Sequence, residues 1–272
     1  MDRPSWAPSD VDVTRPSVAR VYDYYLGGSH NFESDRAFGD QTLRAMPDLP
    51  SILRDNRDFL RRVVRKLCAL GVDQFLDLGS GIPTVGNVHE VAQAAVPGAR
   101  VVYVDHDPVA VAHSRALLEG VPLTATVLAD VREPDVVLDA VRETGLLDLS
   151  RPVGVLMIAL LHFMHDEDRP RELVAAYMDA LPVGSHLAVS HARADGHQGM
   201  RDAAAVYDQS RSPNPMRLRS AEEVRDLFGS LTMVDPGVVL LPRWHPDVVD
   251  DRNAGSEVDD DYPGFGGLGR RD

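Results

Sequence analysis

Residues 75–84 read Phe-Leu-Asp-Leu-Gly-Ser-Gly-Ile-Pro-Thr, and they carry the clearest chemical signal in the chain. A short apolar run leads here through a glycine turn into a stretch compatible with a helix, which is where open α/β sheets bind ligands. Gly79 and Gly81 permit a tight turn and a close approach of the backbone to a ligand. Asp77 can accept hydrogen bonds from a ligand amine or fix the turn. Taken alone, the motif is equally compatible with an ordinary strand-to-helix turn.

Acidic residues also stand at the ends of the next two apolar runs. Asp105 follows Gly79 by 26 residues, near the spacing at which a carboxylate accepts hydrogen bonds from ribose hydroxyls. Asp130 can accept a hydrogen bond from an adenine amino group, with the backbone N–H of Val131 donating to a ring nitrogen. Three acids at the carboxyl ends of three successive strands therefore predict a nucleoside site.

The glycine turn also discriminates between nucleoside ligands. A dinucleotide fold requires a third glycine for close packing of the helix and an open helix N-terminus for the pyrophosphate. In this chain Pro83 lies inside the turn, and Thr84 stands at the position of the third glycine. A ligand with one nucleoside, an amino-acid tail and no phosphate fits better, and S-adenosylmethionine is such a ligand. A nicotinamide-dependent oxidoreductase stays open as a weaker alternative.

Apolar runs and helical stretches alternate along the chain and must position these residues. Runs that are apolar on both faces and separated by helices predict a parallel sheet covered on both sides. Asp107 is expected to cap a helix that starts at Pro108, and Asp55 with Asn56 to cap a helix that ends at Gly71. The expected strands are residues 74–78, 101–104, 124–128, 153–159, 186–189, 238–241 and 265–269.

Composition sets bounds on function. The 272 residues carry a formal net charge of −14, which disfavours nucleic acid as a partner because it repels a phosphate backbone. Cys68 has no second cysteine to pair with, so disulfides and cysteine-rich zinc sites are excluded. The longest apolar run, 153–161, is too short to span a membrane. The acidic N-terminal residues do not resemble a signal peptide, and we expect a cytoplasmic protein.

Several segments together resemble one family, the actinobacterial S-adenosyl methyltransferases, first catalogued as a domain of unknown function. The resemblance runs from about Thr14 to Asp247, and residues 265–271 resemble the family's terminal strand. It implies a Rossmann-like class I methyltransferase fold, an α/β fold with a seven-stranded, mostly parallel sheet, helices on both faces and an N-terminal helical cap. The matching segments are residues 19–28, 31–32, 35–36, 56–57, 59–60, 74–84, 86–93, 103–108, 161–163, 190–191, 219–220, 236–238 and 244–247.

The resemblance also implies an organisation and a set of site residues. Carried over by position, Asp77 and the glycines hold the methionine end of S-adenosylmethionine, Asp105 the ribose, and Asp130 with Val131 the adenine. The residues expected to bind this cofactor are Asp77, Gly79, Ser80, Gly81, Asn87, Asp105, His106, Asp130, Val131 and Ala159. The expected organisation is a loose arm over 1–13, a helical cap over 14–71, and a cofactor-binding domain over 72–272 with a substrate-side insertion at 191–219 and an acidic loop at 246–262.

Two histidines are candidate bases. His162 follows the fourth expected strand and His191 lies just past the fifth, at the edge where cofactor and substrate meet. Imidazole is the side chain best suited to take a proton at neutral pH, although a structural role is the commoner one for such a histidine. His162 and residues 165–168 superficially resemble a metal cluster, but a solvated loop is the better interpretation, and no metal is expected.

A glycine-containing segment near the N-terminus has the composition of a lid. Its candidate residues are Tyr22, Tyr25, His30 and Asn31, which surround two glycines. A tyrosine face attracts a sulfonium through cation–π interaction, and ordinary packing explains the same residues equally well.

The sequence as a whole predicts an S-adenosylmethionine-dependent methyltransferase that transfers the sulfonium methyl by in-line displacement to an unidentified, small-molecule acceptor. The alternative is a regulatory protein that binds S-adenosylmethionine or a nucleoside without methylating anything. The methyl acceptor and the oligomeric state are not indicated by any motif.

Overall fold

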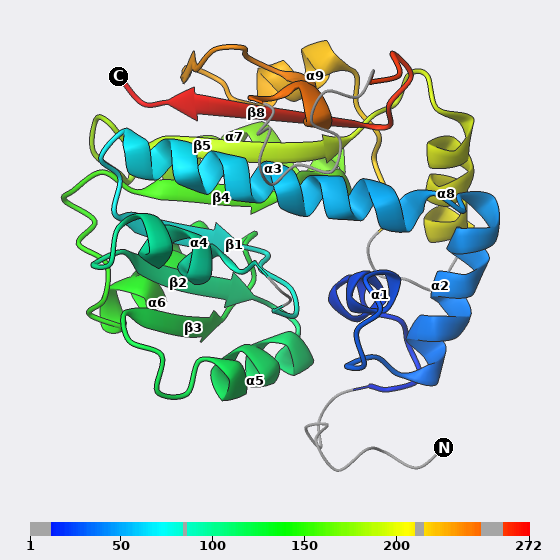
Figure 1. The fold of residues 1–272 in the computed structure, drawn as a ribbon, viewed down its shortest axis with the longest axis horizontal. Coiled ribbons are helices and arrows are strands. Elements are labelled where there is room, and N and C mark those ends of the chain that lie inside the picture. Colours follow the sequence, from blue (N-terminus) through cyan, green and yellow to red (C-terminus); the bar gives the residue numbers. More distant parts are fainter. Residues whose placement is uncertain (1–11, 84–85, 210–214, 246–257) are drawn as a thin grey trace.

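The apolar runs form one sheet in the computed structural model of the protein, which describes residues 12–83, 86–209, 215–245 and 258–272. Five parallel strands lie in the order β3-β2-β1-β4-β5, and antiparallel β8 extends the sheet beyond β5 and pairs with β6 and β7 (Figure 1). The strands are β1 (Gln74–Leu78), β2 (Arg100–Asp105), β3 (Thr124–Leu128), β4 (Gly154–Ile158), β5 (His186–Ala192), β6 (Thr232–Met233), β7 (Val239–Leu240) and β8 (Gly264–Arg270).

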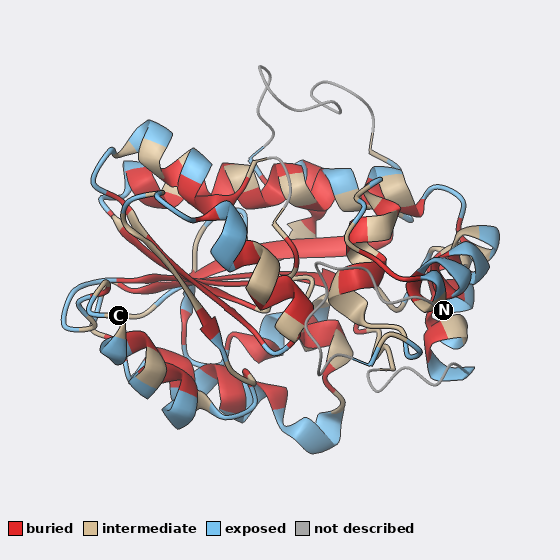
Figure 2. Cartoon of the chain, turned by 90° about the horizontal axis from the view of Figure 1, so that it is seen from below, coloured by how far each residue is buried: buried red, intermediate tan, exposed pale blue. Residues whose placement is uncertain are grey.

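Helices cover both faces of the sheet, and the buried side chains lie along the interfaces between these layers (Figure 2). One face packs on α3 (Leu49–Ala69) and α4 (Val88–Ala95), and the other on α6 (Pro134–Glu143), α7 (Pro170–Asp179) and α9 (Ala221–Leu227). None of the helices in the described ranges is long and apolar enough to cross a membrane. The remaining elements are α1 (Val18–Tyr25), α2 (Glu33–Ala45), α5 (Pro108–Leu117), α8 (Gln198–Gln209), and the short 3-10 turns η1 (Leu161–Phe163), η2 (Asp166–Asp168) and η3 (Leu241–Arg243).

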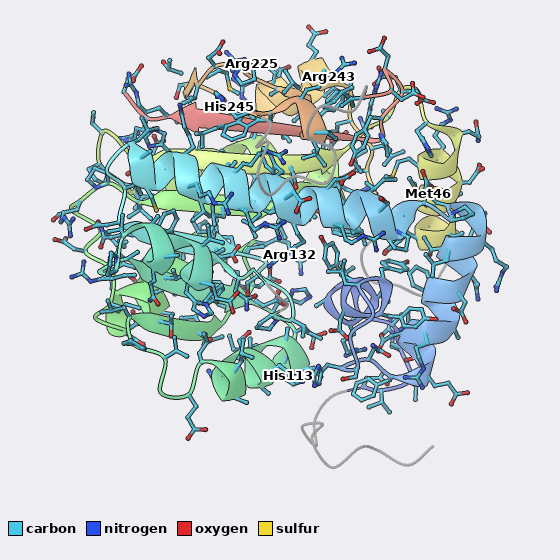
Figure 3. The ribbon with its side chains drawn as sticks, in the orientation of Figure 1. Met46, His113, Arg132, Arg225, Arg243 and His245 are labelled. Carbon is cyan, nitrogen blue, oxygen red and sulfur yellow. The ribbon has the colours of Figure 1, made fainter. Side chains whose placement is uncertain are left out.

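A third group of helices lies beyond the carboxyl ends of β4 and β5 (Figure 1). It contains α1, α2, the first half of α3, and α8, which share one apolar cluster. Met46, between α2 and α3, is fully buried in this cluster and lies beside α8 (Figure 3). Helices of the predicted cap (α1, α2 and the first half of α3) and of the predicted insertion (α8) therefore pack together beyond the same end of the sheet.

The predicted α/β architecture is confirmed. All seven expected strands are present, six of them within one residue of their predicted bounds, while β5 continues three residues beyond its predicted end to Ala192 and so includes His191. The sheet of the described residues has eight strands because Thr232–Met233, a pair too short to give a sequence signal, also pairs with β8. Asp107 caps α5 as expected, its carboxylate accepting from Val109 N at 2.8 Å. The predicted arm and acidic loop lie largely outside the described residues.

Helix α3 differs from its prediction in two respects. It begins at Leu49 rather than near Asp55, so Asp55 and Asn56 are buried inside the helix instead of capping it. Its carboxyl-terminal half, from Phe59 onwards, packs on β1, β4 and α4 in the core of the sheet. The helices of the expected cap are therefore not separate from the sheet, since α3 packs with α1, α2 and α8 through its first half and with the sheet through its second half.

Close packing of α3 on β8 gives a stability prediction. A Cβ at Gly266 of β8 would lie 2.6 Å from Cε2 of Phe59, a fully buried ring that also contacts Trp244 edge-on at 5.3 Å between centroids. The ring has little room to move, so we expect Gly266→Ala to lower the free energy of unfolding by about 1–3 kcal/mol. Urea denaturation measures this change.

The matched control for this substitution is Gly98→Ala. Gly98 is exposed, and a Cβ there meets nothing within 4 Å, so we expect a change of less than about 0.5 kcal/mol. Equal stabilities of the two variants would show that β8 and α3 are not closely packed at Gly266.

Candidate functional site

The end of β1 turns sharply into the glycine loop predicted from the sequence. Gly79 and Gly81 have φ values of +70° and +65°, a conformation that other residues rarely adopt. The backbone N–H groups of Gly79 and Ser80 both donate to Val104 O of β2, at 2.9 and 3.0 Å. A Cβ at Gly79 would lie 2.6 Å from a methyl of Leu160, whereas one at Gly81 would meet nothing within 4 Å. The loop is thus held against β2 and leaves open space beside Gly81.

Asp105, at the end of β2, holds this loop through its carboxylate. Its Oδ2 accepts a hydrogen bond from Gly81 N at 2.7 Å, and its Oδ1 accepts one from Asp107 N at 2.8 Å. The side chain is buried, and this burial raises the pKa of Asp105 above its ordinary value. The sequence indicates no structural role for Asp105, whereas in the structure its carboxylate fixes the backbone at Gly81 and Asp107. A carboxylate oxygen has two lone pairs, so each oxygen can still accept a further hydrogen bond from a ligand.

A pocket of about 830 Å³, counting the space at its mouth, opens above Asp105 and the glycine loop. We call it the charged pocket, because Arg57, Asp77 and Asp105 line it. Seven of the residues predicted to bind a cofactor lie in its wall, namely Asp77, Gly79, Ser80, Gly81, Asp105, His106 and Ala159. The rest of the wall consists of Val18, Ala19, Tyr22, Asn56, Arg57, Leu60, Ile82, Ile158, Leu160 and Phe163.

Asp77 and Arg57 place an acidic and a basic side chain in the wall of the charged pocket, and the charge of Arg57 acts on Asp77. Burial raises the pKa of Asp77 to about 7, with a further increase from the charge of Asp105 and a partial decrease from Arg57. Arg57 donates from Nη2 to Gly86 O at 3.1 Å, while its buried Nε has no hydrogen-bond partner in the described part of the chain. The buried hydroxyl of Ser80 is likewise unpartnered there. These groups suit a zwitterionic amino-acid moiety, whose ammonium faces Asp77 and whose carboxylate faces Arg57.

The other three predicted cofactor residues lie outside the charged pocket. Asn87 is buried at the N-cap of α4. Asp130 forms an ion pair with Arg132 at 2.6 Å, and this hydrogen bond is the main reason that its pKa is lowered (Arg132 is labelled in Figure 3). Val131 is buried, and its carbonyl accepts from the hydroxyl of Tyr177 at 2.8 Å. Asp130 and Val131 therefore do not belong to the wall of the charged pocket.

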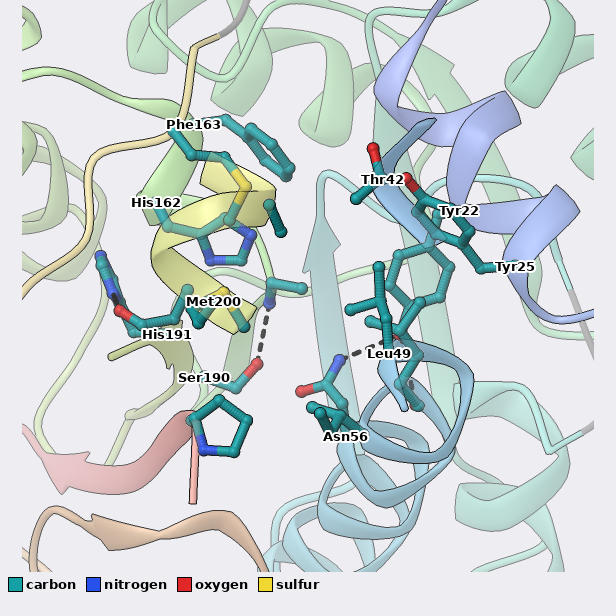
Figure 4. Close-up of a pocket in the computed structure, with 18 of the residues that line it drawn as sticks. Tyr22, Tyr25, Thr42, Leu49, Asn56, His162, Phe163, Ser190, His191 and Met200 are labelled. Atoms are coloured by element: carbon teal, nitrogen blue, oxygen red, sulfur yellow. Dashed lines mark hydrogen bonds between the residues drawn. The ribbon is translucent and has the colours of Figure 1, made fainter. Parts of the chain in front are cut away.

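A second pocket, of about 660 Å³ including its mouth, adjoins the first. We call it the apolar pocket. The two share part of their walls: Val18, Tyr22, Asn56, Ala159 and Phe163. Tyr22, Tyr25, Leu49 and Asn56 lie on one side of it, with His162 and Met200 opposite (Figure 4). The remaining lining residues are Thr42, Ile52, Leu53, Phe163, Ser190, His191, Ala192, Ala203, Tyr207, Met216, Leu241, Pro263 and Gly264.

Both candidate bases reach the apolar pocket, but in different states. His191 Nδ1 lies 2.7 Å from Ala192 O, which only accepts, so Nδ1 carries the proton. Its Nε2 lies 3.0 Å from Nη1 of Arg219, which only donates, so Nε2 accepts. Both ring nitrogens are therefore occupied in the neutral form, and burial lowers the pKa of His191 to about 3. This arrangement suits His191 to holding Arg219 in place.

His162, unlike His191, is not held by hydrogen bonds at both ring nitrogens. Its ring lies 5.5 Å from that of His191 between centroids, and its buried Nδ1 makes no hydrogen bond to any residue in the described ranges. Burial lowers the pKa of His162 well below 6.5, with the charge of Arg219 adding to the effect. His162 is therefore a neutral imidazole that faces a cavity and has capacity for a hydrogen bond.

The predicted lid residues separate into two pairs. Tyr22 and Tyr25 of α1 line the apolar pocket, and Tyr22 also lines the charged pocket. Asn31 instead donates from Nδ2 to Asp23 Oδ2 and to Gly28 O, both at 2.9 Å. His30 packs edge-on against His113 at 3.4 Å between ring centroids. His30 and Asn31 stabilise the turn after α1, and neither lines a pocket.

Sequence reasoning missed Asn56 and Arg57 as site residues, although a signal for Asn56 is present. Asn56 occurs three and four residues before Phe59 and Leu60, within the helical spacing that marks the buried face of α3. A polar residue at such a position requires an explanation, and the structure supplies one. Asn56 Nδ2 donates to the hydroxyl of Tyr22 at 3.1 Å, and its buried Oδ1 has no partner among the described residues at the junction of the two pockets.

Comparisons with known proteins agree with this geometry. The model of a family described as S-adenosyl methyltransferase matches residues 4–272. A crystal structure of a candidate methyltransferase from Thermobifida fusca YX is 39% identical, with a TM-score of 0.90 over 98% of this chain and 99% of that one. A DUF574 family protein from Streptomyces avermitilis MA-4680 is also 39% identical, with a TM-score of 0.89 over 96% and 99%.

A more distant structure shares the fold alone. N-methyltransferase NodS from Bradyrhizobium japonicum WM9, in complex with S-adenosyl-L-homocysteine, is 14% identical, with a TM-score of 0.50 over 93% of this chain and 98% of that one. No protein of curated function matches the sequence. Of the nucleoside ligands considered from the sequence, the family match supports S-adenosylmethionine.

Asp77 is expected to make stability depend on pH. Its pKa of about 7 in the folded protein exceeds the ordinary 3.8, so folding favours the protonated carboxyl. The resulting stabilisation is present below pH 4 and is lost as the pH rises through about 7. The amide introduced by Asp77→Asn stays neutral throughout. We therefore expect the Tm of the ligand-free Asp77→Asn variant to exceed that of the wild type by a margin that grows from pH 4 to pH 7 and reaches several degrees.

Differential scanning calorimetry at pH 4 to 8 measures this margin. The control is Asp139→Asn, at a carboxylate whose side chain is 72% exposed. Parallel Tm profiles for the wild type and Asp77→Asn would contradict the raised pKa.

Proposed function

The chain belongs to the S-adenosyl methyltransferase family, and from that premise we propose how its two pockets divide the reaction between them. It is an S-adenosylmethionine-dependent methyltransferase, and its cofactor supplies a methyl group made electrophilic by a sulfonium. In our proposal the charged pocket binds the cofactor and the apolar pocket binds a small-molecule methyl acceptor. The observation that carries the proposal is that the pockets adjoin, with Tyr22, Asn56 and Ala159 in the wall of both.

The residues of the charged pocket fit the parts of this cofactor. Asp77 would bind the ammonium of the methionine end, and Arg57 with the unpartnered Ser80 hydroxyl would bind its carboxylate. Asp105 keeps lone pairs for the ribose hydroxyls while it holds Gly81. A Cβ at Gly81 would project into open space beside the loop, so the glycine keeps room for a ligand there.

The adenine end is proposed to extend past His106. Asp130 and Val131 follow β3, the strand next to β2, and do not line the charged pocket. Asp130 would accept from the adenine amino group, and Val131 would donate its backbone N–H. Asn87 would act indirectly, since it is buried at the N-cap of α4 and its side chain does not line the pocket.

The protein's own part in the reaction is alignment and exclusion of water. The methyl group already reacts readily, so the main requirement is to hold the nucleophile in line with the carbon–sulfur bond. Val18 and Tyr22 of α1 lie on one side of the junction, and Phe163 of η1 also lines both pockets. These side chains would keep water from competing with the methyl acceptor. His162 would hold the proton of the acceptor where the nucleophile carries one.

The proposal also covers the class of the acceptor, the cellular location and the origin of the protein. A small-molecule acceptor rather than nucleic acid suits the net charge of −14. A single, buried cysteine is compatible with the reducing cytoplasm. An actinobacterial origin fits the two similar solved structures, from Thermobifida and Streptomyces.

Binding of the demethylated cofactor tests the assignment of the charged pocket. We expect wild-type protein to bind S-adenosylhomocysteine in isothermal titration calorimetry, and Asp77→Asn and Arg57→Gln each to weaken binding about 10–100-fold. A hydrogen bond to a charged group contributes about 1.5–3 kcal/mol, which is about one to two powers of ten in affinity. Because Asp77 must be ionised to hold the ammonium, we also expect wild-type affinity to rise from pH 6 to pH 8.

Asp139→Asn serves again as the control and should bind like the wild type. Absence of binding by the wild type would refute the proposal outright. Binding that both variants retain in full would show that the amino-acid end lies elsewhere.

A further inference from the structure

The apolar pocket differs from its neighbour in carrying no charge. None of its lining residues, all of which lie in the described part of the chain, is aspartate, glutamate, lysine or arginine. The charged pocket, by contrast, contains Arg57, Asp77 and Asp105. Arg219 lies behind His191 and is already paired with Asp166 at 2.9 Å. An ionised methyl acceptor would have to leave water for a wall that offers no unpaired counter-charge, which is strongly unfavourable. The acceptor must therefore be neutral where it contacts this wall.

The titratable groups in the wall are also held neutral. Burial raises the pKa of Tyr25 to about 12 and that of Tyr207 well above 10, so both phenols stay protonated. Burial also raises the pKa of Tyr22. His162 and His191 are kept as neutral imidazoles because burial lowers the pKa of each. The pocket thus stays uncharged across the physiological pH range.

Flat and polarisable side chains dominate the shape of the pocket. Tyr22 and Tyr25 of α1 face Phe163 across the cavity (Figure 4), and the ring of Tyr207 lies 5.6 Å from that of Phe163 between centroids. Met200 and Met216 complete this lining. Aromatic and thioether groups of this kind contact aromatic ligands favourably through stacking, edge-on and sulfur–aromatic contacts.

Three polar groups in this wall have a buried atom without a hydrogen-bond partner among the described residues, namely the hydroxyl of Tyr25, Oδ1 of Asn56 and Nδ1 of His162. His162 is 93% buried, since 7% of its surface is exposed, and Figure 4 shows its ring among the residues that surround the cavity. Its buried Nδ1 has no hydrogen-bond partner in the described ranges. A neutral imidazole carries one acceptor nitrogen, and leaving such a group buried and unpaired is costly. A ligand hydroxyl, which can both donate and accept a hydrogen bond, would remove this cost in either tautomer of the ring.

We propose that the methyl acceptor is a neutral aromatic molecule whose hydroxyl group donates a hydrogen bond to His162. This inference rests on the proposed function of the two pockets. In the reaction, the hydroxyl oxygen forms the new O–CH3 bond as the bond from sulfur to the same carbon breaks. The hydroxyl proton passes to His162 and then to solvent, and the products are an aryl methyl ether and S-adenosylhomocysteine.

Naphthalene derivatives of one size but different charge test the proposal. The probes are 2-naphthol, naphthalene, 2-naphthoate and the cation of 2-(aminomethyl)naphthalene, titrated at pH 7.5 into protein saturated with S-adenosylhomocysteine and followed by calorimetry. We expect 2-naphthol to bind, naphthalene to bind about tenfold more weakly, and both charged probes to bind at least tenfold more weakly than 2-naphthol. Equal or tighter binding of either charged probe overturns the proposal.

Substitutions at His162 test the role of its ring. His162→Leu should weaken binding of 2-naphthol about 5–10-fold, the equivalent of one neutral hydrogen bond, and leave binding of naphthalene within about twofold. His162→Gln keeps an acceptor oxygen and should restore most of the affinity for 2-naphthol. A purely structural role for His162 would instead weaken both probes equally, and this result overturns the proposal. His165→Gln is the control, since His165 lies outside both pockets.

A space-filling variant locates the probe site and separates this proposal from the preceding one. Met200 lines the apolar pocket but not the charged one. Met200→Trp should therefore abolish binding of 2-naphthol and retain binding of S-adenosylhomocysteine. If S-adenosylhomocysteine binds to the wild type and 2-naphthol does not, the inference about the methyl acceptor fails while the proposed function stands. If S-adenosylhomocysteine itself does not bind, both fail.

Discussion

The carboxylate of Asp105 connects the sheet, the glycine loop and the N-terminal helices, and both pockets depend on how it is held. It accepts from Gly81 N and from Asp107 N, and Asp107 in turn caps α5 and receives Arg20 of α1 at 3.4 Å. Arg20 also pairs with Asp35 of α2 at 2.9 Å, and all these charged side chains are buried. Removing one partner from such a buried network leaves an uncompensated charge. The network therefore fixes the position of α1 relative to the glycine loop.

Helix α3 fixes the other side of the site, because its two halves are packed against different parts of the molecule. Its first half belongs to the apolar cluster of α1, α2 and α8, and its second half packs on the sheet. Asn56 lies between these halves and hydrogen-bonds Tyr22, so the junction of the two pockets is built from two helices that are anchored independently. A junction held from both sides suits a reaction in which alignment provides most of the rate enhancement.

The sequence predicts those parts of the molecule that follow from local patterns. The doubly apolar runs predict the strands, and the acids at their ends predict Asp77 and Asp105 at one edge of the sheet, since parallel strands end together. The helical spacing marks Asn56 as buried but does not reveal its role, and Arg57 gives no local signal, because both roles depend on where α3 crosses the sheet. The start of α3 was misplaced for a related reason. Asp55 and Asn56 are good capping residues by type, but tertiary contacts bury both inside a longer helix.

One pocket carries charged side chains and the other does not, and this difference matches what the two reactants require. The cofactor brings a positive sulfonium and a zwitterionic tail, and it requires fixed charges such as those of Asp77 and Arg57. A neutral nucleophile that attacks a sulfonium spreads this charge over a larger volume in the transition state, so a dry, uncharged wall around the nucleophile does not oppose the reaction. Fixed charges in the apolar pocket would instead bind water and compete with the nucleophile for orientation. The net charge of −14, which disfavours nucleic acid, does not determine the charge of a small-molecule acceptor, because what this acceptor meets is a local wall with no carboxylate among its described residues.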